Sequence, residues 1–150
     1  MLDLVWSDRL KRFEWIEHPS DIGFRAYGRN LAEAFENAAL ALFEIMVDTS
    51  KVEPKKEIEV EIDAEDESAL LYDWLDRLLY FHDSQNLVMS KFKLNISRIG
   101  DGLKLRGKGW GETFDPLKHS ERTSVKAMTY HMMEIKHEKE RCWVQVIVDI

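Results

Sequence analysis

Alternating apolar and polar positions mark several stretches of the chain as strands. In residues 22–28 the side chains alternate in this way, and in residues 57–63 Ile58, Val60 and Ile62 alternate with acidic residues. A period of two places one set of side chains on each face of a sheet, so both segments are predicted to be strands, the second with one face in water. Residues 13–21 begin with a similar pattern, which runs into a turn at Pro19.

Two longer stretches repeat their apolar residues every three or four positions. Residues 31–47 follow Asn30, with Glu33 three positions further on, which is an asparagine variant of the capping box. Residues 65–83 begin with several acids, which suit the positive end of a helix dipole. Each stretch is predicted to be an amphipathic helix with one buried face. A charged segment, residues 48–56, links the first helix to the next strand.

The second half of the chain contains two hairpin patterns. Residues 90–111 form two period-two runs around a Gly-Asp-Gly turn at 100–102. Residues 132–137 and 142–150 are separated by the polar turn 138–141. The segment 119–131, which lies between these hairpins, is compatible with either a strand or a short helix.

The order of these elements predicts the fold class. About seven strands and two main helices occur in an order that is not a β-α-β alternation. We therefore expect a single α+β domain with a mixed or largely antiparallel β-sheet and both helices packed on it. A chain of 150 residues can bury one such core without disulfides.

Composition is that of a globular protein in a reducing compartment. Apolar residues make up 45% and charged residues 33% of the chain. The longest apolar stretch, residues 37–47, is half a bilayer long and contains Glu44, so no membrane span is expected. The first residues lack a signal-peptide pattern, and the single cysteine, Cys142, is expected to be a buried, inert thiol. These features predict a cytoplasmic protein.

The charge is negative overall but unevenly placed. The formal net charge is −7, which argues against nucleic acid as the main ligand. Residues 91–108, however, contain six basic residues and one acid, Asp101. One interpretation is an edge hairpin whose lysines discourage pairing with other chains. The other is a docking surface for an acidic partner or RNA.

Motifs of well-known catalytic sites are missing from the sequence. There is no glycine-rich phosphate loop, paired CxxC, HExxH or GxSxG, and the glycines of "GKGWGET" follow a strand instead of opening a helix. His82 and Asp83 are expected in a solvated helix end. Three further histidines lack metal-ligand spacing: His119, His131 and His137.

Three local features remain as candidates for chemistry. His18 and Asp21 flank a proline turn, where Asp21 alone has the ordinary role of bonding its own backbone. Lys126 stands in an apolar run, where a lysine usually extends its ammonium group to solvent. Asp149 precedes Ile150, so two carboxylates lie side by side where the sequence ends. They form either a solvated tail or half of a metal site.

These features co-occur with others in one family pattern. The stretches "HPSDIGFRAYG", "AFENAALALFEIM", "LLYDWLDRLLY", "GE" at 111–112, "VKAMTYHMMEI" and "VIVDI" together resemble the archease family. The resemblance runs in order from about Glu14 to Ile150. It implies an archease-like domain over residues 13–150, preceded by an N-terminal extension over residues 1–12.

The resemblance implies a partner and a role. Archeases assist the RtcB-type tRNA-splicing RNA ligase, which is guanylylated by GTP before it joins RNA ends. They are not ligases themselves; they promote guanylylation and multiple turnover, and they can broaden the nucleotide that the ligase accepts. The expected partner is therefore this ligase, with tRNA contacted only through it. Lys126 falls on the lysine that matters for this activation.

The resemblance also implies a divalent cation, typically calcium, bound by Asp21, Asp149 and Ile150. The chemistry of these residues independently suits that assignment. Two aspartates and a terminal carboxylate supply only hard oxygen atoms, which favour Ca²⁺ or Mg²⁺ over zinc. One departure from the family pattern is that His18-Pro19-Ser20-Asp21 replaces the usual His-Thr-Ala-Asp. Proline fixes φ and removes a donor, so the turn that holds Asp21 is expected to differ in detail.

Three alternatives to ligase activation stay open at this point. In the first, Asp21, Asp149 and a cation activate water, and the protein is a metal-dependent phosphohydrolase or phosphotransferase. In the second, the protein is an adaptor or chaperone-like modulator of RNA modification. In the third, Asp149 is a solvated terminus and the protein is only a scaffold.

Overall fold

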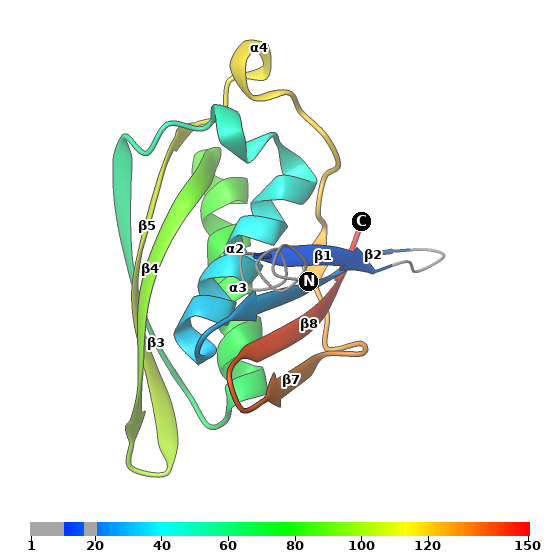
Figure 1. The fold of residues 1–150 in the computed structure, drawn as a ribbon. Coiled ribbons are helices and arrows are strands. Elements are labelled where there is room, and N and C mark those ends of the chain that lie inside the picture. The colour runs from blue at the N-terminus through cyan, green and yellow to red at the C-terminus, as the bar shows by residue number, and fades with distance from the viewer. Residues whose placement is uncertain (1–10, 17–20) are drawn as a thin grey trace.

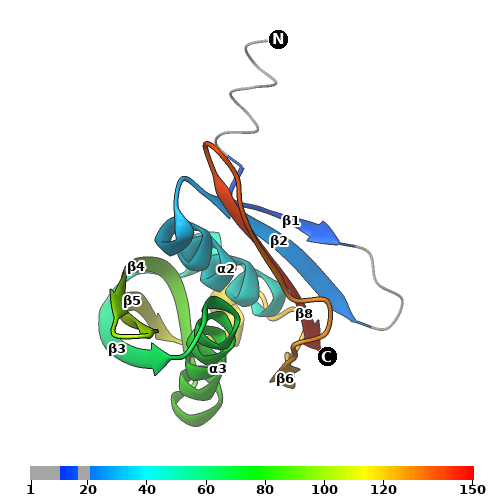
Figure 2. The same cartoon turned by 90° about the horizontal axis from the view of Figure 1, so that it is seen from below.

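The computed structural model describes residues 11–16 and 21–150, which form two antiparallel sheets with the two long helices between them (Figures 1 and 2). The predicted turn that contains His18 and most of the predicted extension, residues 1–10, lie outside the described residues. None of the described helices is both long enough and apolar enough to cross a bilayer.

The larger sheet is built around the last strand of the chain. Its strands are β1 (Phe13–Ile16), β2 (Ile22–Gly28), β6 (Ala127–Met128), β7 (Glu134–His137) and β8 (Cys142–Asp149). The order is β1-β2-β8-β6, and β7 also pairs with β8. Strand β8 is buried along its length except at Asp149. Residues on both faces of β8 are buried, which explains why its sequence is nearly all apolar.

The smaller sheet contains the predicted hairpin. Its order is β3-β5-β4, with β3 (Lys56–Ala64), β4 (Leu87–Ile99) and β5 (Gly102–Thr113). The inward residues of β3 pack against the core, whereas its glutamates face solvent, as the alternation predicts.

The glycines of β5 serve packing. A Cβ on Gly107 would lie 2.2 Å from a methyl group of Leu94, and one on Gly111 would lie 1.8 Å from the carbonyl oxygen of Val88. Only glycine allows β4 to approach β5 this closely. This close approach explains the glycines of "GKGWGET" by strand packing.

The long helices are α2 (Leu31–Met46) and α3 (Glu67–Gln85). Asn30 caps α2 by accepting a hydrogen bond from the Glu33 N–H at 2.9 Å, and Asp66 caps α3 in the same way. The helices contact each other directly, since the Trp74 indole N–H donates to the carbonyl of Phe35 at 3.1 Å. The described residues also contain two short helices, η1 (Thr49–Lys51) and α4 (Pro116–His119).

The observed fold confirms the predicted α+β class and refines its arrangement. The strands divide between two sheets instead of one, and the described pairs are all antiparallel. The ambiguous segment 119–131 is neither a full strand nor a helix: it contains only the end of α4 and the two-residue strand β6. Cys142 is a buried free thiol, as predicted, and burial raises its pKa to about 11.

Candidate functional site

The structure brings Asp21 and Asp149 to the same end of the larger sheet. In the β2–β8 pair, Ile22 lies opposite Val148. Asp21 immediately precedes Ile22 and Asp149 immediately follows Val148, so the antiparallel register places both aspartates at one end of the pair. Asp149 is exposed and Asp21 is half-buried. The distance along the chain between these residues gave no hint of this proximity.

Lys126 lies at the same end of the sheet. Its backbone N–H donates to the carbonyl oxygen of Asp149 at 2.8 Å, and the next residue, Ala127, pairs with Asp149 in the β6–β8 ladder. The Lys126 side chain is exposed, in agreement with a lysine that extends to solvent. Figure 2 shows β6 beside the C-terminal end of β8.

Ile150 continues the chain beyond β8. Its partly buried side chain packs against the hydrophobic core. This packing fixes the position of Ile150 next to Asp149. The backbones of Asp21, Lys126 and Asp149 therefore lie at one end of the larger sheet, together with Ile150.

The ligand atoms at this end of the sheet are of the type that a hard cation prefers, but their number is small. The side chains of Asp21 and Asp149 offer only oxygen, which Ca²⁺ and Mg²⁺ prefer. Among residues 11–16 and 21–150, no three His, Cys, Asp or Glu side chains are close enough together to hold a metal ion. A site with two side-chain carboxylates must therefore take its remaining ligands from the main chain, water or a partner.

The segment that leads to Lys126 is held against α2. The carbonyl oxygens of Ile45 and Met46, near the C-terminal end of that helix, accept hydrogen bonds from Thr123 N–H at 3.0 Å and Arg122 N–H at 2.8 Å. Carbonyl groups in the last turn of a helix lack partners within the helix, so this segment satisfies them. Residues 120–126, here called the connecting segment, thus have a fixed path from α4 to β6.

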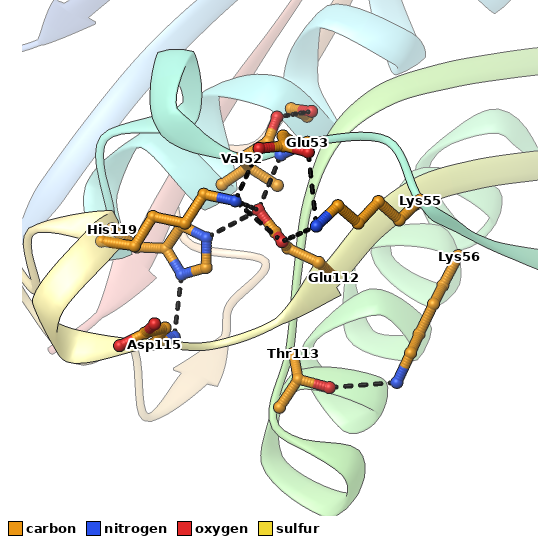
Figure 3. Close-up of polar contacts among 10 residues, drawn as sticks. Val52, Glu53, Lys55, Lys56, Glu112, Thr113, Asp115 and His119 are labelled. Carbon is orange, nitrogen blue, oxygen red and sulfur yellow. Dashed lines mark hydrogen bonds and ion pairs between the residues drawn. The ribbon is translucent and has the colours of Figure 1, made fainter.

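A buried polar network anchors the other end of the connecting segment (Figure 3). The Glu112 carboxylate at the end of β5 accepts hydrogen bonds from the backbone N–H of Glu53 at 2.8 Å and from Lys118 Nζ at 2.9 Å. His119 is fully buried, and its Nε2 lies 2.9 Å from the same carboxylate. Burial acts to raise the pKa of Glu112, but these donors outweigh it and bring that pKa down to about 2.

The hydrogen bonds of His119 define its tautomer. Nδ1 accepts a hydrogen bond from the Asp115 N–H at 2.8 Å, so it carries no proton, and Nε2 must be the donor to Glu112. Both ring nitrogens of His119 are thus occupied by hydrogen bonds within the protein. This network was not predicted from the sequence. The only available signal was "GE" at 111–112, because nothing in the spacing connects Glu112 to His119.

The other histidine predictions have mixed outcomes. His82 and Asp83 lie in the last turn of α3 as predicted, and Asp83 is exposed. His82 is half-buried, and its Nδ1 lies 2.8 Å from the carbonyl oxygen of Leu87. The ring is held because the chain turns back at Asn86 into β4. His137 is exposed and contacts Glu67 at 2.8 Å.

The basic residues at 91–108 divide between two environments. Those of the central strand β5 face the acids of β3, with Lys104 lying 3.0 Å from Glu61 and Lys108 lying 3.8 Å from Glu59. The edge-hairpin interpretation therefore fails for β5, because β3 covers it. It fits β4, which is an edge strand and contains Lys91, Lys93 and Arg98.

Comparison with known proteins identifies the family. A family model described as the Archease protein family matches residues 13–150. "Protein archease" from Sulfurisphaera tokodaii is 55% identical over 94% of this chain and all of its own length. "Protein archease" from Methanothermobacter thermautotrophicus is 50% identical with the same coverage.

Two solved structures are similar to this fold. The solution structure of Methanobacterium thermoautotrophicum protein 1598 has a TM-score of 0.83 at 50% identity, covering 93% of this chain and 99% of that one. The crystal structure of a Thermotoga maritima archease, described as a possible chaperone, has a TM-score of 0.59 at 23% identity, covering 90% and 94%. The second likeness concerns the fold alone. From the family match and the close relatives, this chain belongs to the archease family.

Proposed function

We propose that this protein activates an RtcB-type tRNA-splicing RNA ligase, promoting its guanylylation and multiple turnover and broadening the nucleotides it accepts. The observation that carries the proposal is the 2.8 Å hydrogen bond between Lys126 N and Asp149 O, which joins the proposed activating lysine to the proposed metal site. Family membership supports the same role. On this proposal the protein is a cytoplasmic protein cofactor of an enzyme, and tRNA is contacted only through the ligase.

We further propose that Asp21, Asp149 and a carboxylate of Ile150 bind Ca²⁺. The donor chemistry supports a hard cation, and the small number of carboxylates suits a site that a partner completes. The cation would supply positive charge at the face that meets the ligase. The described side chains would position it through the β2–β8 register and the packing of Ile150.

The proposed task of Lys126 is to present a compact positive charge to the ligase. An exposed ammonium group can contact a nucleotide phosphate or an acidic group of the ligase. The hydrogen bond to Asp149 and the anchored connecting segment fix the backbone from which this side chain extends. A fixed backbone reduces the conformational entropy lost when the contact forms.

The direct test is RNA ligation by a purified cognate ligase with GTP, an excess of RNA ends, and either no addition or the purified protein. The proposal predicts that the ligase alone stops after about one round, whereas the protein sustains many rounds. Guanylylated ligase should also form faster. If product never exceeds one equivalent of ligase with the protein present, the activator role is wrong. Phosphoester hydrolysis by the protein alone would then point to the metal-dependent hydrolase.

A further inference from the structure

Two tyrosines, one exposed and one partly buried, stack on each other beside the candidate site. Tyr72 of α3 and Tyr130, which follows β6, have ring centroids 4.3 Å apart with 9° between their planes. Tyr130 is 55% exposed, and Met132 in the same turn is 51% exposed. Tyrosine and methionine side chains at the surface are typical of protein interfaces. Tyr72, Tyr130 and Met132 are called the aromatic patch below.

The turn that carries the aromatic patch is held rigidly by the sheet beneath it. Thr129 Oγ1 donates to the carbonyl of Ile147 at 2.7 Å, and the side-chain amide of buried Gln145 donates to the carbonyl of Met132 at 3.0 Å. Met132 has a φ of 53°, a left-handed conformation that side chains other than glycine rarely adopt. The exposed side chains are thus presented in a fixed arrangement, which lowers the entropy lost on binding.

Acidic residues lie near the aromatic patch on the side of α3. Asp73 follows Tyr72 on α3, and Glu65 and Asp66 lie at the start of that helix; all three are exposed. Burial raises the pKa of Tyr130, and the negative charges of Asp73, Asp66 and Glu65 raise it further, which agrees with their proximity to the ring. Asp149 continues the acidic surface toward the candidate site, since it pairs with Ala127 of β6.

The combination of stacked aromatic rings and nearby carboxylates favours a cationic partner. Phosphate groups are repelled by the surrounding carboxylates, which excludes a nucleic-acid backbone as the natural occupant. An arginine guanidinium group can stack flat on an aromatic ring while its N–H groups pair with carboxylates. A lysine ammonium group is a compact point charge and cannot stack in this way. Other exposed apolar residues, such as Tyr80 and Leu117, lack a stacked partner in the described structure.

We propose that the aromatic patch, with Glu65, Asp66 and Asp73, is a docking surface for an arginine-bearing segment of a protein partner. This inference deepens the proposed function, under which the partner is the RNA ligase. Lys126 and Asp149 then meet the ligase's reacting centre, while the aromatic patch holds a basic segment of the same protein nearby.

The first experiment measures affinity for the ligase. Tyr130→Ala removes the stack and Asp73→Lys reverses a charge at an exposed helix position. Tyr80→Ala and Asp83→Lys are matched controls at exposed positions of the same helix. We expect the first two variants to lose about tenfold in affinity, with Asp73→Lys also weakening the salt dependence, and the controls to bind like the wild type.

The second experiment does not depend on the ligase. The full chain is titrated with the peptide acetyl-Gly-Arg-Gly-Arg-Gly-amide while the ring signals of Tyr72 and Tyr130 are followed by NMR. We expect saturable shifts at these rings, which Asp73→Lys abolishes and Asp83→Lys does not. A Gly-Glu-Gly-Glu-Gly peptide and an oligouridylate serve as acidic controls and should leave the rings unchanged.

Several results would overturn the inference. Wild-type ligase affinity in both patch variants would show that the ligase docks elsewhere. Peptide shifts spread equally over all surface acids, or tyrosine shifts produced by oligouridylate and not by the arginine peptide, would exclude a specific arginine surface. A protein that fails to activate the ligase but still binds the arginine peptide at Tyr130 would contradict the proposed function alone.

Discussion

At the scale of single residues, the candidate site depends on where β8 ends. Asp149 is the one exposed residue of an otherwise buried strand, and it is bonded on one side by the backbone of Lys126. Asp21 lies at the same end of the sheet, directly before strand β2, which pairs with β8. A site built from the end of a strand and its neighbours is sensitive to strand register. A shift of the register by one residue would move each side chain to the opposite face of the sheet.

Calcium binding should depend on the exact position of the last carboxylate. We expect the purified protein to bind Ca²⁺ weakly, with a Kd of about 10⁻⁴ to 10⁻³ M, since few protein ligands are available. Asp149→Asn and an added C-terminal glycine should each weaken binding by about tenfold, the latter because it moves a ligand. Isothermal titration calorimetry with Ca²⁺ alone measures this, with Asp101→Asn as the control.

Unchanged Ca²⁺ affinity in the glycine-extended protein would remove Ile150 from the proposed site. Unchanged affinity in Asp149→Asn would remove the site altogether.

The residues of the candidate site could be named from the sequence, but their contacts could not. Asp21, Lys126, Asp149 and Ile150 were picked out because several motifs resemble one family. The hydrogen bond between Lys126 and Asp149 depends on the short β6–β8 ladder. A two-residue strand has no detectable period, so the pattern of residues 119–131 carried no information about it.

At the scale of elements, the connecting segment links two polar anchors. One end is fixed by Glu112 and His119 at α4, and the middle is bonded to the last turn of α2. Neither anchor could be predicted from the sequence. Each includes hydrogen bonds between residues that lie far apart in the chain and come together only in the folded structure. Buried carboxylates require several donors, and the structure supplies them to Glu112.

Replacing Glu112 by glutamine should destabilise the protein in a pH-dependent way. The pKa of Glu112 falls from 4.5 to about 2 on folding, so its contribution to stability is complete above about pH 4.5 and is lost as the pH falls toward 2. We expect Glu112→Gln to lower the free energy of unfolding by about 2 kcal/mol at pH 7 and by less at pH 3. Urea unfolding at both pH values measures the difference.

Glu121→Gln, at an exposed position of the connecting segment, is the control and should change stability by less than about 0.5 kcal/mol. An equal loss for Glu112→Gln at pH 3 and pH 7 would show that the charge of Glu112 is not what stabilises the network.

At the scale of the whole molecule, the sequence predicted the class of fold but not the division into sheets. Periodicity identifies which side chains share a face of one strand, and it does not say which strands pair. The pairing of β3 with β5 joins distant segments and is reinforced by ion pairs such as Lys104 with Glu61. Those same pairs offset most of the basic charge of β5, which a count along the sequence could not reveal.

The layered arrangement gives the molecule one face rich in candidate chemistry. The larger sheet ends in Asp21, Asp149 and Lys126, and the turn after β6 carries the aromatic patch beside α3. The smaller sheet lies on the other side of the helices (Figure 2). We therefore expect partner contacts to concentrate at the end of the larger sheet that contains Asp21, Asp149 and Lys126.

The measurement that tests this account most directly is multiple-turnover RNA ligation with matched variants. A cognate ligase with GTP is given the wild-type protein, Lys126→Met, Asp149→Asn, or the exposed controls Lys139→Met and Asp101→Asn. The account predicts that both site variants reduce turnover by at least about tenfold, as expected for losing a charged contact, while both controls activate fully. If Lys126→Met and Asp149→Asn sustain as many rounds as the wild type, the end of β8 is not the activating site.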